Sequence, residues 1–221
     1  MGIIFHIGRY TRFILRVLRK PENGAVFLRS LLNEMTTIGT NSVGIVTLLS
    51  LFMGAVMCLQ TAHQVSGWIP AYTIGFTVRQ TMILEFSPTL IPVILAGKIG
   101  SNIASQLGTM RVTEQIDALE IMGINSAGFL TLPKIIAGII CLPMLVIMSM
   151  FLGVASGAGI AYITEVSSMA DFQYGLQVDF VSYDVIYALI KTTIFSIVMT
   201  SVSAYHGYHT HGGAIEVAKS S

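Results

Sequence analysis

The sequence predicts an all-α membrane protein, a polytopic bundle of transmembrane helices preceded by amphipathic interfacial helices. Of its 221 residues, 53% are hydrophobic and only 10% are charged, against about 25% charged in ordinary soluble domains. The apolar residues stand in long uncharged blocks and not in the short periodic runs of a soluble core. Lipid is therefore the expected solvent for most of the chain.

The N-terminal region, residues 1–38, is predicted to be interfacial and cytoplasmic. Residues 5–20 interleave apolar side chains with arginines at roughly helical spacing, as in a helix lying on an anionic membrane surface. A solvated basic helix that contacts a partner is the alternative. Six of the twelve basic residues lie in the first thirty positions, which predicts that this end stays in the cytoplasm.

The remainder, residues 39–221, is predicted to be the transmembrane domain. The first predicted span, 43–62, has no charge over twenty residues, enough at ~1.5 Å per residue to cross a ~30 Å hydrocarbon core. The other expected spans lie at about 82–107, 135–162 and 185–205. The second contains Glu85, Pro88, Pro92 and Lys98, so part of it must face protein or a cavity.

The connections between spans differ in charge. Residues 108–134 are polar with Arg111 and Lys134, and we place them in the cytoplasm. Residues 163–184 carry four acidic residues and no Lys or Arg, which fits the opposite side of the membrane.

Catalytic and cofactor motifs are missing from the sequence. It has no phosphate-binding G-x-x-x-x-G-K-[ST] loop, no convincing catalytic triad and no zinc-protease motif. The near-neutral charge gives no reason to expect nucleic acid. Cys58 and Cys141 lie in apolar blocks and are expected to be buried. His206, His209 and His211 lie in a glycine-rich stretch without cysteine, so no metal site is predicted.

Residues 85–123, EFSPTLIPVILAGKIGSNIASQLGTMRVTEQIDALEIMG, resemble the signature of the MlaE (YrbE) permease family. Members place a glutamate at the start of the second span, then a proline-containing helix, a small-residue turn and a cytoplasmic EQIDAL-like helix. Two features depart from the family pattern. Lys98 stands where many members have arginine, and the chain stops at Ser221 where members continue into a last, fifth hydrophobic span. The latter indicates a partial sequence.

The resemblance implies a non-catalytic permease subunit that forms a homodimer in the inner membrane of a Gram-negative-type bacterium. The implied partners are two cytoplasmic ABC ATPase subunits, which bind ATP and Mg, a periplasmic MCE-type lipid-binding protein, and a small cytoplasmic regulatory subunit. Together they would move phospholipid between the inner and outer membranes. No cofactor is expected in this chain itself.

Two residues are predicted to bind lipid, Glu85 and Trp68. Glu85 lies where the second span begins, so its carboxylate is expected at the rim of a cavity between the two protomers, since an unpaired charge in lipid is costly. A salt bridge to Arg79 or Lys191 is the alternative. Trp68 would contact lipid tails or simply anchor the chain at the interface.

The segment 113–120 is predicted to be a helix that couples the permease to the ATPase. Its acidic residues recur every three positions, while Ile116 and Leu119 present a different side. An ordinary solvated cytoplasmic helix is the alternative. The predicted coupling residues are Thr113, Glu114, Gln115, Ile116, Asp117, Leu119 and Glu120.

Two rival functions remain open at this stage. A polytopic membrane enzyme acting on lipids would use Glu85 or the terminal histidines as acid and base, and would be active as an isolated subunit. A scaffold that only anchors lipid-binding and ATPase partners would keep its lipid content after Glu85 is replaced.

Overall fold

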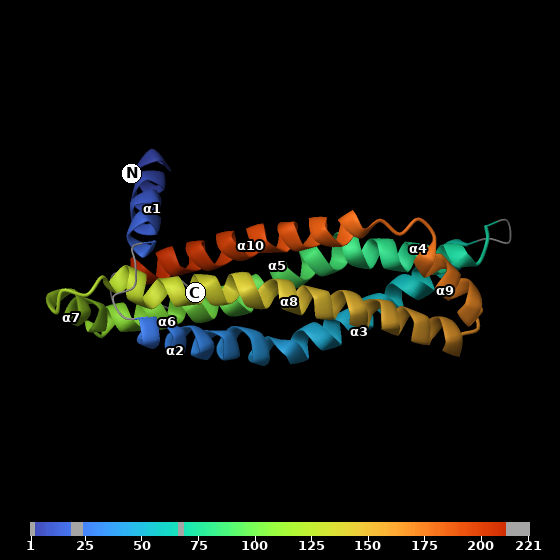
Figure 1. Ribbon diagram of the computed structural model, residues 1–221, viewed down its shortest axis with the longest axis horizontal. Helices are drawn as coiled ribbons and strands as arrows, with labels where there is room; N and C mark the ends of the chain where they lie inside the picture. The colour runs from blue at the N-terminus through green and yellow to red at the C-terminus, as the bar shows by residue number, and fades with distance from the viewer. Residues whose placement is uncertain (1–2, 19–23, 66–68, 211–221) are drawn as a thin grey trace. The chain divides into compact units, whose positions relative to one another are not determined.

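The computed structural model describes residues 3–18, 24–65 and 69–210, and every element within these ranges is helical (Figure 1). This confirms the predicted all-α class. The first part of the chain contains α1 (Ile3–Val17), α2 (Gly24–Met35), the π-helical segment η1 (Thr36–Thr40), α3 (Asn41–Gln64) and α4 (Tyr72–Thr81). The middle contains the π-helical η2 (Met82–Leu90), α5 (Ile91–Leu95), the π-helical η3 (Ala96–Gly100), α6 (Ser101–Val112) and α7 (Gln115–Ile121). The last elements are α8 (Ser126–Ile163), α9 (Met169–Gln177) and α10 (Ser182–Tyr208).

Four helical stretches of the described chain are long and apolar enough to cross a membrane: Gly24–Gln64, Tyr72–Val112, Ser126–Ile163 and Ser182–Tyr208. Each contains one of the four segments that the sequence analysis selected. The second stretch begins at Tyr72, ten residues before the expected start, because the polar segment ahead of Met82 forms α4 and runs directly into η2.

The prolines of the second stretch explain its irregular geometry. Pro88 lies inside η2 and Pro92 inside α5. Proline lacks the N–H that an α-helix uses and its ring clashes with the preceding turn. Wider π-helical turns are one way in which a helix absorbs such a residue without ending. The stretch thereby continues through both prolines to Val112.

The chain divides into two compact units, each assembled from distant segments. Unit 1 contains residues 1–40, 94–141 and 195–221, and unit 2 contains residues 41–93 and 142–194. Each unit therefore depends on contacts between residues that are far apart in the sequence.

Unit 2 has a core of buried side chains from α3, α4, η2, α8 and α9. Its members are Cys58, Ile74, Val78, Met82, Ala161 and Phe172. Where α3 and α8 meet, a Cβ built on Gly54 would lie 1.9 Å from the carbonyl oxygen of Gly153, so the two backbones touch. Small residues of this kind allow close helix packing in membranes.

Several buried polar groups of unit 2 are hydrogen-bonded within it. Ser50 donates to Ser149 at 2.8 Å, and Ser149 donates to Ser87 at 3.1 Å, which links three helical segments. Arg79 is 4% exposed and donates to the carbonyl oxygens of Leu176 and Val178 at 2.8 and 2.9 Å. Those carbonyls belong to the C-terminal end of α9, where a cation is favourable.

Unit 1 is held together by one charged contact in particular. Lys134 of α8, 5% exposed, forms a salt bridge with Glu34 of α2 and donates to the side-chain oxygen of Gln106 of α6 at 2.6 Å. A buried lysine needs such partners, because an unpaired ammonium in an apolar environment is costly.

Candidate functional site

Glu85 is an exposed residue of η2, within the second membrane-spanning stretch. The salt bridge to Arg79 or Lys191 is not present among the described residues. Arg79 is bound to the end of α9, and Lys191 Nζ lies 3.5 Å from the carbonyl oxygen of Leu84. A charged side chain on the outside of a lipid-spanning helix is expensive unless it faces protein or water. Glu85 is therefore an unusual residue for a surface in contact with hydrocarbon.

The other predicted lipid-binding residue, Trp68, lies outside the described residues. Tyr72 of α4, close to Trp68 in the sequence, is described: it forms an edge contact with Tyr174 of α9, with ring centroids 5.5 Å apart. It places an aromatic cluster at the start of α4, where interface-seeking residues were expected.

The predicted coupling segment forms a short, well-defined loop of unit 1. The chain turns just before α7 at Glu114, which has a positive φ of 59°. It turns again after α7 at Gly123, which has a φ of 81°. Ile116 is completely buried and fixes α7 in place. Arg111 and Asp117 form a salt bridge at 2.6 Å across the turn.

The outward face of this loop is where a partner could bind. Thr113, Glu114 and Gln115 are exposed and Leu119 is half-buried. Two apolar residues that the sequence analysis did not select are the most accessible: Ile121 is 87% exposed and Met122 is 65% exposed. A sequence signal did exist, because two apolar side chains next to a turn glycine have no role in a solvated loop.

Glu120 joins this loop to the ends of two long helices of unit 1. Its Oε1 accepts from Ser126 of α8 and from Tyr208 of α10, each at 2.9 Å, and those two hydroxyls lie 2.7 Å apart. The hydrogen bond from Tyr208 is the main cause of a lowered pKa for Glu120; Ser126 and the positive charge of Arg111 add to it, and partial burial opposes it. The three residues form one polar network.

This network predicts a pH-dependent contribution to stability. The lowered pKa means that the folded state favours the ionised carboxylate, so Glu120 stabilises the fold above its unfolded pKa of about 4.5 and this contribution is lost as the pH falls through the folded value. We expect Glu120→Gln to lower stability at pH 7 by no more than about 1 kcal/mol, since the residue is exposed.

The difference between wild type and Glu120→Gln should shrink below pH 4.5. Thermal unfolding of the detergent-solubilised chain between pH 3 and pH 8 measures it. Glu114→Gln is the matched control in the same loop and should show no such trend; a difference that is constant with pH would contradict the role of the carboxylate charge.

His209 is held by backbone and aromatic contacts. His209 Nδ1 lies 3.0 Å from the carbonyl oxygen of Tyr205, and its ring packs against the rings of Phe13 and Tyr208. His211 lies outside the described residues. Among those that are described, no three His, Cys, Asp or Glu residues are grouped as metal ligands would be.

Comparison with known proteins places these features in a family. The family described as Permease MlaE matches residues 31–221. The chain is 31% identical over 218 residues to a probable ABC transporter permease protein of Rickettsia bellii, covering 96% of this chain and 82% of the relative. A probable ABC transporter permease protein of Synechocystis is 32% identical over 197 residues, 89% of this chain and 75% of that protein.

A plant protein is also similar. The protein TRIGALACTOSYLDIACYLGLYCEROL 1, chloroplastic, of Arabidopsis thaliana is 29% identical over 216 residues, 94% of this chain and 58% of the plant protein. The bacterial relatives are named as permeases of ABC transporters, a class that works with separate ATPase subunits. The chain therefore belongs to the MlaE permease family and is a multi-pass membrane permease subunit of an ABC transporter.

Proposed function

We propose that this permease moves phospholipids between the inner and outer membranes of a Gram-negative-type bacterium. Two copies would enclose a lipid cavity, two cytoplasmic ATPase subunits would supply energy from ATP and Mg, and a periplasmic MCE-type protein would exchange lipid with the cavity. A small cytoplasmic regulatory subunit would complete the assembly. The chain itself would catalyse no reaction.

The observation that carries this proposal is the exposed carboxylate of Glu85 in a membrane-spanning stretch. In hydrocarbon the charge would be strongly unfavourable, whereas at the rim of a cavity between two copies it would be hydrated and close to lipid headgroups. Exposed apolar side chains in the same stretch, Val93 at 55% and Ile94 at 42%, would be covered by a second copy or by lipid tails. A lipid cargo also agrees with the name of the plant relative, which is that of a galactose-bearing lipid.

Energy coupling would pass through the loop that contains α7. The exposed residues Thr113, Glu114, Gln115, Ile121 and Met122 would contact the ATPase, and Leu119 would border that contact. Ile116, Asp117 and Glu120 would act from within the permease. Ile116 is buried, and the other two hold α7 to the ends of α6, α8 and α10. Movement of α7 would therefore reach three long helices directly.

Replacing Glu85 tests the cavity. We expect Glu85→Lys and Glu85→Ala to lower the amount of phospholipid that co-purifies with the gently solubilised complex at least severalfold, because the group at the cavity rim changes charge or is lost. Mass spectrometry of bound lipid measures it, with ATPase activity recorded on the same sample. Leu48→Ala, a change of an exposed apolar residue in α3, outside the second stretch, is the control and should retain lipid.

Each outcome of this test separates the competing functions. Unchanged lipid content in the Glu85 variants would contradict the cavity and favour a scaffold. Lipid hydrolysis by the isolated subunit, abolished in Glu85→Ala, would favour an enzyme. An ATPase subunit, a lipid-binding partner and phospholipid in one complex would support the transporter.

Replacing the exposed apolar pair tests the coupling loop. Burial of a large apolar side chain at an interface is worth about 1.5–3 kcal/mol, so Ile121→Ser/Met122→Ser should weaken ATPase binding tenfold or more. Co-elution with the ATPase subunit and the rate of ATP hydrolysis measure the loss. Val112→Ser removes a 37% exposed side chain at the end of α6 and serves as the control; an equal loss in both variants would place the contact elsewhere.

A further inference from the structure

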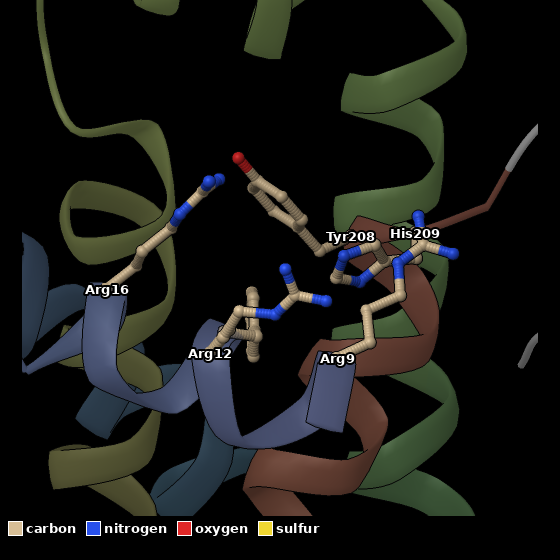
Figure 2. Close-up of a pocket in the computed structure, with 6 residues that line it drawn as sticks. Arg9, Arg12, Arg16, Tyr208 and His209 are labelled. Carbon is tan, nitrogen blue, oxygen red and sulfur yellow. The ribbon is translucent and has the colours of Figure 1, made fainter. Parts of the chain in front are cut away.

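A cavity of about 260 Å³ lies in unit 1, between α1 and the C-terminal end of α10. The residues that line it are Arg9, Arg12, Phe13, Arg16, Tyr208 and His209. Figure 2 shows the three arginine side chains reaching from α1 toward Tyr208 and His209. Two segments almost two hundred residues apart in the sequence therefore build one strongly basic pocket, with room for several waters or for a compact anion.

Packing of α1 against α10 fixes the pocket in place. Phe13 is 3% exposed, and its ring packs against the rings of Tyr205 and Tyr208, with centroid distances of 5.8 and 5.2 Å. Tyr10 is hydrogen-bonded to Ser201 at 2.6 Å, and the backbone oxygen of Arg16 accepts from Asn125 at 2.8 Å. These contacts hold the arginine-bearing face of α1 toward the end of α10. Arg12 donates its Nε–H to the backbone oxygen of Gly8 at 3.3 Å, which leaves its terminal N–H groups for a ligand.

The three arginines of the pocket concentrate positive charge, and few acidic side chains among the described residues offset it. Arg9, Arg12 and Arg16 follow each other at three- and four-residue spacing, where like charges repel. Neither of the two salt bridges in the described chain involves them. The carboxylate of Glu120, which Tyr208 and Ser126 already bind, lies within electrostatic range of Arg16. An anion in the pocket would remove this repulsion.

The chemistry of the walls identifies the anion. Guanidinium groups offer paired N–H donors that match the oxygens of a phosphate group. His209 turns its Nδ1 to the carbonyl oxygen of Tyr205 and contributes an aromatic wall with Phe13 and Tyr208. A pocket with charged donors on one side and rings on the other suits a phosphate ester better than a bare ion.

The remaining face of α1 indicates where that phosphate comes from. Leu15 and Leu18 are 63% and 66% exposed, and on a helix they lie away from the buried Phe13 and Val17. An amphipathic helix with exposed leucines beside arginines places its apolar side in the acyl boundary and its cations at headgroup level. We infer that this pocket binds the phosphate of an anionic phospholipid headgroup, at a site separate from the proposed transport cavity.

Lipid binding to the full chain in neutral detergent tests the inference. The probes are a short-chain phosphatidylglycerol and, in a second arm, inorganic phosphate; retained ligand is counted by native mass spectrometry. We expect phosphatidylglycerol to bind, with about fivefold weaker affinity in Arg12→Gln and about tenfold to thirtyfold weaker affinity in Arg12→Gln/Arg16→Gln. Arg12→Lys/Arg16→Lys keeps the positive charges but loses the paired N–H donors of the guanidinium groups. Its affinity for phosphatidylglycerol should lie between those of the glutamine variants and that of the wild type.

Matched controls keep the result interpretable. Arg29→Gln removes one cation from α2, outside the pocket, and should bind as wild type does. Gel filtration and the thermal midpoint establish that each variant is folded, and the lysine variant retains a test if the glutamine variants do not fold. Equal losses in Arg12→Gln and Arg29→Gln, or no loss in the double variant, would overturn the site. Binding of inorganic phosphate without binding of phosphatidylglycerol would overturn the lipid assignment and favour a soluble phosphate ester.

The headgroup-binding test does not depend on the proposed transport function. The pocket variants leave Glu85 intact, so a variant that loses headgroup binding while retaining cavity lipid would support both sites. Failure of the headgroup test would leave the proposed transport function unaffected.

Discussion

Replacing Gly54 by alanine is expected to prevent the close packing of α3 on α8 in unit 2. The new Cβ would lie 1.9 Å from the carbonyl oxygen and 2.7 Å from the carbonyl carbon of Gly153, and both atoms are backbone that no side-chain rotation can remove. Overpacking of a tight core typically costs about 1–3 kcal/mol and occasionally more. A clash with backbone belongs at the top of this range, so we expect a loss of about 3 kcal/mol or more.

The chain supplies matched controls for this change. Gly44 lies in the same helix with nothing within 4 Å of its would-be Cβ, so Gly44→Ala should leave stability unchanged or raise it by about 0.5–1 kcal/mol. Gly153→Ala would meet the flexible end of Met82 at 2.0 Å and should cost less than Gly54→Ala. Thermal unfolding of the detergent-solubilised chain, followed by size exclusion, ranks the three variants. Equal midpoints for Gly54→Ala and Gly44→Ala would contradict the close approach.

Replacing Lys134 by methionine is expected to destabilise unit 1 nearly as much. The change removes the ammonium that pairs with Glu34 and hydrogen-bonds to Gln106, and leaves the Glu34 carboxylate, whose side chain is 19% exposed, without a counter-charge. Breaking a buried pair by removing one partner costs about 3–5 kcal/mol, mostly as the penalty on the remaining charge. The same unfolding measurement records the loss.

A double substitution separates this mechanism from simple loss of packing. In Lys134→Met/Glu34→Leu no charge is left behind, so the double variant should be more stable than Lys134→Met alone. Arg111→Met breaks the more exposed pair with Asp117, whose side chains are 25% and 48% exposed, and should cost less than about 1 kcal/mol. If the loss of stability in the double variant equals the sum of the losses in Lys134→Met and Glu34→Leu, the two residues act independently.

Much of the fold was predictable, because the bilayer imposes its requirements on each helix separately. A span must be about twenty apolar residues long whatever its neighbours are, so the long apolar blocks of the sequence mark all four stretches of the described chain that could cross a membrane. The start of the second stretch was missed because Arg79 and Gln80 look like loop residues. Their polarity is accommodated inside the protein, by the carbonyl oxygens at the end of α9 and by Asp184.

The candidate site was predictable in its location and less so in its contacts. The motif around 85–123 marked both Glu85 and the predicted coupling loop. The helix in that loop covers Gln115–Ile121 and so starts two residues later than the predicted 113–120, because Glu114 takes a positive φ in the turn before it. Its connection to Ser126 and Tyr208 could not be predicted, since Tyr208 is 88 residues from Glu120 in the sequence. Periodicity indicates which face of a helix is buried, but not which helix covers it.

The sequence by itself determined the helical class, the family and the four long apolar stretches of the described chain, because composition and local pattern are sufficient for each. The tertiary structure alone decided which residues meet: Gly54 with Gly153, Lys134 with Glu34, and the arginines of α1 with the end of α10. The physical reason is that these contacts join residues about a hundred or more positions apart. Their free energy depends on the geometry of two packed helices, which no single segment contains.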